Sequence, residues 1–416
     1  MSEKNLDFDT VINRKNTRSL KYDFAKERGK PEGILPLWVA DMDFKVSSYI
    51  QEALEEIDHH GIFGYSEAKE SYFDALQSWM KRRHDWKVRE EWLVKTPGVV
   101  YALAMAIRAY TKEGEAVLIQ PPVYYPFSEV ILDNKRKLVT NELCQDEGGH
   151  YQIDFEDFEK KIVEENVKLF LLCNPHNPVG RVWTKEELAR LGDICYQHKV
   201  IVISDEIHAD FIFDSKKAKC LAGNAAQSAY AEATAPKHTV FTNVKEAYRE
   251  FGIVCTSPSK TFNIAGLQVS NIFIANKELR ERFCREINAT GYSQLSLPGL
   301  VACEAAYRHG EEWLDALLRY IQGNADDTRD FLKEKLPKIR MTELEGTYLV
   351  WLDFRAYGLS EQELNERIVQ KAGLWLDDGR MFGRAGKGFQ RINIACPKKT
   401  LHEALGRLAA AFEELE

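Results

Sequence analysis

The middle of the chain alternates short apolar runs with longer segments of helical periodicity. The apolar runs lie at Ala116–Gln120, Lys168–Cys173, Val200–Ser204, Gly252–Thr256 and Asn271–Ala275. Helical patterns lie before, between and after them at Val99–Tyr110, Thr184–His198 and Lys277–Ile287. Parallel strands are joined by crossover connections, usually helices, and are covered on both faces. The sequence therefore predicts an α/β fold with a doubly wound large domain over roughly residues 48–290.

The pattern changes after Pro298, where long amphipathic helices appear. Two further strands are expected at Thr347–Phe354 and Gln390–Ala395, with a final helix at Lys398–Leu415. A chain of 416 residues is long enough for two domains. We expect residues 1–47 to form an N-terminal arm and part of the small domain, residues 48–290 the large domain, and residues 291–416 a small α+β domain. The Ala-, Gly- and Ser-rich segment Leu221–Pro236 fits neither pattern and is interpreted as a surface insertion, with a lid as the alternative.

Lys260 follows two hydroxyl residues, Ser257 and Ser259, just after the strand predicted to end at Thr256. Open α/β sheets bind ligands outside the carboxyl ends of their parallel strands. The two serines could bind an anion there while the Lys260 amine reaches an aldehyde. The alternative is a solvated lysine in a turn.

Asp205 ends the apolar strand predicted at Val200–Ser204. A buried carboxylate without a partner is costly, so a cation is expected to face it. The protonated ring nitrogen of pyridoxal phosphate is such a cation, and an Asp partner keeps it charged. The alternative is a helix N-cap, for which Asp is also favoured.

Two further turns could complete a site. The prolines and glycine of Asn174–Gly180 stop a strand and present Asn177, whose amide could donate to a phenolate oxygen. Gly98 makes a turn at the start of a predicted helix, where free backbone amides and the helix dipole favour a phosphate.

Taken together, these residues resemble the pyridoxal-phosphate enzymes of fold type I, the aspartate-aminotransferase fold. The chain is most similar to the cystathionine β-lyase or cysteine-S-conjugate β-lyase branch of the aminotransferase class I/II superfamily. This resemblance covers nearly the whole chain and rests on Leu37–Phe44, Phe63–Tyr65, Cys173–Arg181, Ser204–His208, Ser259–Asn263 and Arg391–Pro397. It implies a large domain with a mainly parallel seven-stranded sheet and a small α+β domain.

The resemblance also implies a role for each site residue. Lys260 would be the Schiff-base lysine, Asp205 the partner of the pyridine nitrogen, Asn177 the phenolate donor and Tyr124 the ring-stacking residue. The phosphate would be bound by Gly98, Val99, Val100, Ser257, Ser259 and, from a neighbouring subunit, Tyr65. Arg391 would bind the substrate α-carboxylate as a planar, bidentate donor, with Ala40 and Asn177 beside it.

Two positions depart from the pattern of aspartate aminotransferases. Those enzymes carry a tyrosine three residues after the Asp and an arginine eight residues after the Lys. Here the positions are His208, which we place among the cofactor-binding residues, and Gln268. Both changes match the lyase branch. They argue against assigning the aminotransferase activity of those enzymes to this chain.

The expected reaction is α,β-elimination from L-cystathionine or a cysteine S-conjugate, which gives a thiol, pyruvate and ammonia. Lys260 would act as general base, and Lys260 or Tyr124 could supply a proton to the leaving group. An aminotransferase that uses the same lysine, aspartate and arginine is the first alternative. A cofactor-binding regulatory protein that contacts a transcription factor is the second.

Charge and cysteine usage exclude other classes. The net charge is −8 and no basic run appears, which argues against nucleic acid and anionic membranes as partners. The polar N-terminus and the absence of long apolar runs predict a cytoplasmic protein. Its eight scattered cysteines are interpreted as reduced core residues, with no metal site expected. A site shared between subunits implies a homodimer.

Overall fold

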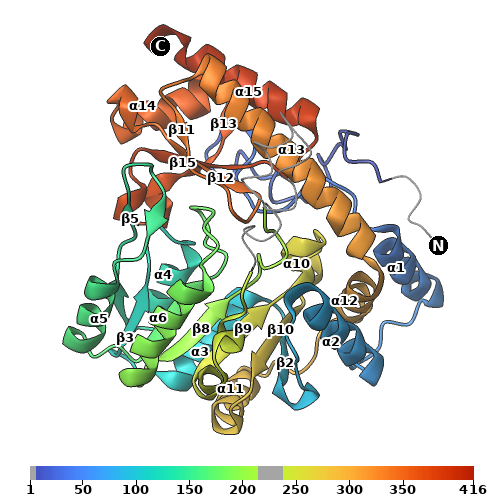
Figure 1. The fold of residues 1–416 in the computed structure, drawn as a ribbon. Coiled ribbons are helices and arrows are strands. Elements are labelled where there is room, and N and C mark those ends of the chain that lie inside the picture. The colour runs from blue at the N-terminus through green and yellow to red at the C-terminus, as the bar shows by residue number, and fades with distance from the viewer. Residues whose placement is uncertain (1–5, 214–237) are drawn as a thin grey trace, which may run out of the picture.

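The computed structural model describes residues 6–213 and 238–416. Within them the largest sheet has seven strands in the order β2-β10-β9-β8-β7-β3-β4 (Figure 1). Their bounds are β2 (Leu93–Thr96), β3 (Ala116–Ile119), β4 (Lys137–Thr140), β7 (Leu169–Cys173), β8 (Ile201–Asp205), β9 (Gly252–Thr256) and β10 (Ser270–Ile274). β10 alone runs in the opposite direction to the other six strands. The expected mainly parallel seven-stranded sheet is confirmed.

All five strands expected in this region form, with ends that differ by at most one residue from the prediction. Strands β2 and β4, at the two edges of the sheet, were not expected. Each is four residues long and contains a lysine, and none of the first three residues of β2 is fully buried. Edge strands need less apolar surface than central ones, so their sequence signal is weak.

Helices cover both faces of this sheet, as the strand composition predicts. In β7, Leu169 and Leu171 pack with residues of α3, α4 and α11, whereas Phe170 and Leu172 pack with α5 and α6. These helices are α3 (Val99–Tyr110), α4 (Pro126–Asp133), α5 (Phe155–Glu164), α6 (Lys185–Gln197) and α11 (Lys277–Ala289), with the short α9 (Phe241–Val244) beside α6. The expected capping pattern at Thr184 is present as a complete capping box with Glu187.

A second, four-stranded antiparallel sheet forms near the C-terminus in the order β11-β12-β15-β14. Its strands are β11 (Arg340–Met341), β12 (Leu349–Asp353), β14 (Asp377–Asp378) and β15 (Phe389–Asn393). Helices α13 (Glu311–Lys335), α14 (Glu361–Glu366) and α15 (Lys398–Phe412) surround it (Figure 1). The expected small α+β unit is therefore present.

The N-terminal segment joins this smaller unit. Strand β1 (Leu35–Pro36) pairs with β13 (Leu374–Trp375), so residues far apart in sequence lie side by side. Helices α1 (Ser48–His60) and α2 (Glu70–His84) instead pack on α12 (Leu297–His309). A small hairpin of β5 (Cys144–Gln145) and β6 (Tyr151–Gln152) completes the strands of the described residues. The domain boundaries at 47/48 and 290/291 stay predictions.

The cysteines in the described part of the chain are all free thiols. Five of them are buried as expected, namely Cys173, Cys195, Cys255, Cys303 and Cys396. The expectation is wrong for Cys144, which is exposed in the β5–β6 hairpin, and Cys284 is only half-buried. Cys220 and the segment Leu221–Pro236 lie outside the described residues.

Candidate active site

The carboxyl ends of the parallel strands bring the predicted residues to one edge of the large sheet. Tyr124 follows β3, Asn177 follows β7, Asp205 ends β8, and Lys260 lies in the short helix α10 (Pro258–Thr261) after β9. They line a cavity of about 200 Å³. The predicted residues in its wall are Ala40, Gly98, Val99, Val100, Tyr124, Asn177, Asp205, His208, Ser259 and Lys260.

Lys260 points into the protein rather than into solvent. It is half-buried, and its Nζ donates to the backbone oxygen of Ala40 at 2.6 Å. Burial lowers the pKa of Lys260 to about 8; the positive charge of Arg391 adds to this shift, and the carboxylates of Asp41 and Asp205 oppose it. The alternative of a solvated turn lysine is wrong.

Asp205 is a buried acid without a cationic partner among the described residues. Only 5% of its surface is exposed, and its Oδ1 accepts a hydrogen bond from the Ile207 amide at 3.2 Å. Burial raises the pKa of Asp205 to about 7, the charge of Glu206 adds to the shift, and the Ile207 amide and Lys260 oppose it. Residues 207–210 form a turn and no helix begins between Asp205 and residue 213, so the N-cap alternative is not supported.

His208 and Tyr124 present neutral rings to the same cavity. His208 is buried, and its Nδ1 has no hydrogen-bond partner within the described residues. Burial, together with the charges of Lys260 and Arg391, holds the pKa of His208 well below its usual value. Burial raises the pKa of Tyr124, so its hydroxyl stays protonated near neutral pH.

The start of α3 supplies unpaired backbone donors. Gly98 precedes the helix, no side chain caps it, and Val99 and Val100 form its first turn in the cavity wall. The first amides of a helix lack intrahelical acceptors, and the dipole makes this end positive. This end of α3 therefore favours an anion.

The two serines before Lys260 have different environments. Ser259 lines the cavity. Ser257 does not, because its hydroxyl donates to the Val269 carbonyl at 2.7 Å and accepts from the Ser259 amide at 3.1 Å. Ser257 thus caps α10, and its hydroxyl is engaged within the protein.

Arg391, in β15, is buried in the wall of the smaller unit. Its Nη1 donates to Asn177 Oδ1 and its Nη2 to the Trp38 carbonyl, each at 2.9 Å, and Nη2 also contacts the buried carboxylate of Asp377. Its Nε has no partner within the described residues. Since Asn177 Oδ1 is occupied by Arg391, the Asn177 amide nitrogen remains as the donor for the cavity. Arg391 does not line the cavity itself, so its role in binding a substrate carboxylate stays a prediction.

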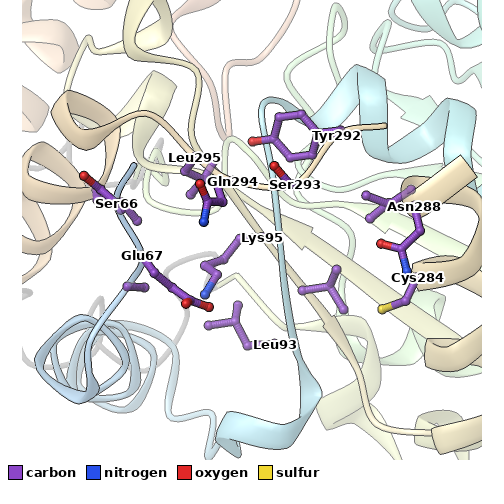
Figure 2. A pocket seen from close by; sticks show the side chains of 14 residues that line it. Ser66, Glu67, Leu93, Lys95, Cys284, Asn288, Tyr292, Ser293, Gln294 and Leu295 are labelled. Atoms are coloured by element: carbon purple, nitrogen blue, oxygen red, sulfur yellow. The ribbon is translucent and has the colours of Figure 1, made fainter. Parts of the chain in front are cut away.

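Tyr65 does not line the cavity of its own chain. Its side chain is fully exposed, and the neighbouring Ile62 and Phe63 are about two-thirds exposed (66% and 64%). A second pocket, of about 240 Å³, lies beside this segment. Ser66 and Glu67 lie opposite Lys95 and Tyr292 in its lining (Figure 2). The two pockets have no lining residue in common.

Sequence reasoning missed several residues around the site. Tyr348 donates to the Ala40 carbonyl, Asp377 pairs with Arg391, and Asn263 and Asn393 hold the segment that contains Ala40. The two asparagines stood in motifs that carried the resemblance, so a signal was present for them. Asp377 belongs to a two-residue strand with no such signal.

The sequence profile of the family "Aminotransferase class I and II" matches residues 33–408. The chain belongs to this family. Within the part of the chain that is described, no helix is long and apolar enough to cross a membrane. No cluster of three His, Cys, Asp or Glu side chains suited to a metal ion occurs there either.

Several characterised or structurally solved proteins are similar to this chain over nearly their full length. Cystathionine beta-lyase PatB of Bacillus subtilis is 42% identical over 98% of this chain and 100% of its own length. Cystalysin of Treponema denticola, whose structure contains pyridoxal 5'-phosphate, is 38% identical with a TM-score of 0.90, covering 99% of each chain. The pyridoxal-phosphate-bound C-S lyase of Staphylococcus hominis is 32% identical with a TM-score of 0.86, covering 98% of this chain and 99% of its own.

Proposed function

We propose that this protein is a pyridoxal-phosphate-dependent carbon–sulfur β-lyase that converts L-cystathionine or cysteine S-conjugates to a thiol, pyruvate and ammonia. One observation carries the proposal: a single cavity combines Lys260, Asp205, Asn177 and a free helix N-terminus in a chain 42% identical to a cystathionine beta-lyase along its length. The similar structures of cystalysin and of the Staphylococcus hominis C-S lyase support the same reaction class.

The cavity fits pyridoxal phosphate at three points. Asp205 is buried without a cation, which suits a protonated pyridine nitrogen. The amides at the start of α3 and Ser259 suit a phosphate, whereas the hydroxyl of Ser257 is already engaged. The unpartnered Nδ1 of the neutral His208 and the amide of Asn177 offer hydrogen bonds to the ring's oxygen.

Lys260 supplies the reactive amine. With its pKa lowered to about 8, a fraction of the amine is neutral near physiological pH and can bond to an aldehyde or accept a proton. When bound, the cofactor withdraws electrons from the substrate's α-carbon. Lys260 then removes the α-proton, and Arg391 fixes the substrate carboxylate through a planar guanidinium.

The leaving group needs little assistance from the protein. A thiol has a pKa of about 8.5, so a thiolate leaves the β-carbon more readily than hydroxide does. Tyr124, which burial keeps protonated, and Lys260 are two groups in the cavity wall that can donate a proton.

We also propose a homodimer in which Tyr65 contributes to the neighbouring subunit's site. The fully exposed Tyr65 and the exposed Ile62 and Phe63 support an interface at this segment. A Tyr side chain exposed in this way has an apolar body and a polar hydroxyl, which suits a phosphate at a subunit boundary.

The deciding experiment measures pyruvate and free thiol from L-cystathionine with purified protein, with and without an added keto acid. Lys260→Ala is the matched inactive control. Equal amounts of pyruvate and thiol without the keto acid, lost in the variant, are the expected result. Turnover only with a keto acid would make the protein an aminotransferase, and cofactor binding without turnover would favour a regulatory protein.

A further inference from the structure

Three sequence motifs meet beside Lys260 in a way that the proposed chemistry does not use. Asn263 follows Lys260 by three residues, and Asn393 follows Arg391 by two. Both side chains bond to the backbone of Leu37–Phe44, more than 200 residues away in sequence. The motifs thus form one local structure.

Asn393 holds the two peptide groups that flank Ala40. Its Nδ2 donates to the carbonyl of Val39 at 2.8 Å and to that of Asp41 at 2.7 Å, and its Oδ1 accepts from the Ala395 amide. Asn393 is completely buried. Buried side-chain amides with every group paired fix a backbone more firmly than solvated ones do.

Asn263 holds the next turn of the same segment. Its Nδ2 donates to the carbonyls of Met42 at 3.0 Å and Phe44 at 2.9 Å, and its Oδ1 accepts from the Met42 amide at 2.9 Å. Its φ of 56° lies in the left-handed region, which asparagine tolerates better than most residues. The backbone of Lys260–Asn263 is therefore tied to the segment that faces it.

Charged residues fix the other side of the segment. Arg14 pairs with Asp41 at 2.6 Å and with Asp43 at 2.7 Å, and the fully buried Lys21 pairs with Asp43 at 2.8 Å. Tyr22 also donates to Asp43. Removing one member of such a buried group would leave an unpaired charge, so the cluster resists movement.

Together these contacts fix the position of the Ala40 carbonyl beside the Lys260 amine. The Ala40 oxygen accepts from Lys260 Nζ at 2.6 Å and from the buried Tyr348 hydroxyl at 2.9 Å. We propose that Asn263 and Asn393 are positioning residues that hold the Ala40 carbonyl as the resting acceptor for the Lys260 amine whenever that amine is free. The inference rests on the proposed role of Lys260.

A held acceptor matters because the lysine side chain is long and flexible. An amine released by the substrate could turn away from the α-carbon, and a displacement of about 1 Å can cost roughly a hundredfold in rate. Anchoring at Ala40, in the wall of the same cavity, keeps Nζ within the site. The acceptor also favours the charged amine over the neutral one.

The test compares two buried asparagines whose Nδ2 atoms each donate to two backbone carbonyls; within the described residues only Asn393 also accepts a hydrogen bond, from the Ala395 amide. Asn324 is completely buried and donates to the carbonyls of Ile394 and Cys396, each at 2.8 Å, but does not touch the segment around Ala40. Asn393→Leu and Asn324→Leu therefore each leave two carbonyls unpaired. Asn263→Gly, which keeps the left-handed backbone accessible, provides a second variant if Asn393→Leu does not fold.

Two readouts separate positioning from a structural role. The first is the pH dependence of Lys260 carbamylation by cyanate in the cofactor-free full-length chain, followed by peptide mass spectrometry. The second is kcat and KM of the holoenzyme. We expect Asn393→Leu and Asn263→Gly to lower the pKa of Lys260 and to reduce kcat by about tenfold or more with little change in KM.

Asn324→Leu should change neither readout. The proposal is overturned if the pKa of Lys260 is unchanged in both Asn393→Leu and Asn263→Gly, or if Asn324→Leu shifts this pKa equally. Because carbamylation does not depend on which reaction the holoenzyme catalyses, a failure of the lyase proposal would leave this test intact.

Discussion

Asp205 and Lys260 face one cavity from the ends of neighbouring strands. Burial shifts the pKa of each so that the neutral form of the side chain is favoured. The pKa of Asp205 rises to about 7 and that of Lys260 falls to about 8. Below about pH 7 the chain without cofactor is therefore more stable with Asp205 protonated. Such a site stores unfavourable charge that a cationic ligand relieves.

This argument gives a prediction for the pH dependence of stability. The native pKa of Asp205 lies above its ordinary value of 3.8, so between about pH 4 and pH 7 the folded chain binds more protons than the unfolded one. Stability of the cofactor-free chain should therefore fall as pH rises through this window, by up to about 4 kcal/mol. Asp205→Asn should remove this loss, as measured by urea unfolding at several pH values.

At neutral pH we expect the cofactor-free Asp205→Asn variant to be more stable than the cofactor-free wild type, and we expect bound cofactor to reverse this order. The wild-type chain should then be the more stable of the two at neutral pH, because the variant lacks the partner of the ring nitrogen. Equal pH profiles for the two cofactor-free proteins would contradict this account of Asp205.

A second residue-scale prediction concerns Asp377, which is buried against Arg391. Asp377→Asn leaves a buried guanidinium without its counter-charge and should cost about 3 kcal/mol of stability. Asp378→Asn is the matched control, because the partner of Asp378, Arg380, is half exposed (50%) and such pairs contribute less than about 1 kcal/mol.

The carboxylate of an added amino acid can replace the missing charge. Glycine should therefore raise the melting temperature of Asp377→Asn holoenzyme more than that of the wild type. A smaller increase, or equal losses of stability in both variants, would show that Asp377 does not neutralise Arg391.

At the scale of elements, the parallel strands and their ends could be predicted because each strand carries its own local signal. The central strands are wholly buried and apolar, and Asn177, Asp205 and Lys260 follow them directly. The edge strands and the two-residue strand β14 have no comparable signal, since pairing and not composition defines them. Asp377 therefore went unpredicted.

The start of α3 is the element whose role can be tested most cleanly. Gly98 has an extended backbone, and a Cβ added there would meet nothing within 4 Å. Gly98→Ala should change the stability of the cofactor-free chain by less than about 0.5 kcal/mol. A methyl group in the cavity wall should nevertheless weaken phosphate contact and raise the Kd for pyridoxal phosphate about tenfold.

Gly266→Ala is its control. A Cβ at Gly266 also meets nothing within 4 Å, and this residue lies outside the cavity wall. Cofactor titrations by fluorescence should give an unchanged Kd for this variant. If both variants, or neither, weaken binding, the amides at the start of α3 do not hold the phosphate.

At the scale of the whole molecule, the site depends on contacts that no local pattern encodes. Leu37–Phe44 bonds to Lys260, Asn263 and Asn393, each more than 200 residues away in sequence. The resemblance to a family pointed to these motifs, but their mutual bonds became apparent only in three dimensions. The proposed homodimer would extend the same dependence beyond one chain.

Shared sites between subunits give the last prediction. If Tyr65 serves the neighbouring subunit's site, then Tyr65→Ala and Lys260→Ala each inactivate a homodimer, but at different positions of the composite site. In a mixed dimer one site carries both substitutions and the other carries neither. Random exchange makes half of the dimers mixed, so about a quarter of all sites should be intact.

An equimolar mixture of the two variants, exchanged until native mass spectrometry detects mixed dimers, should therefore regain about a quarter of the wild-type activity. Tyr65 is fully exposed and does not line the cavity around Lys260 in its own chain, so neither substitution should alter the surroundings of the other within one chain. If mixed dimers form without any recovery, Tyr65 acts in its own chain's site, since each chain would then carry one complete defect.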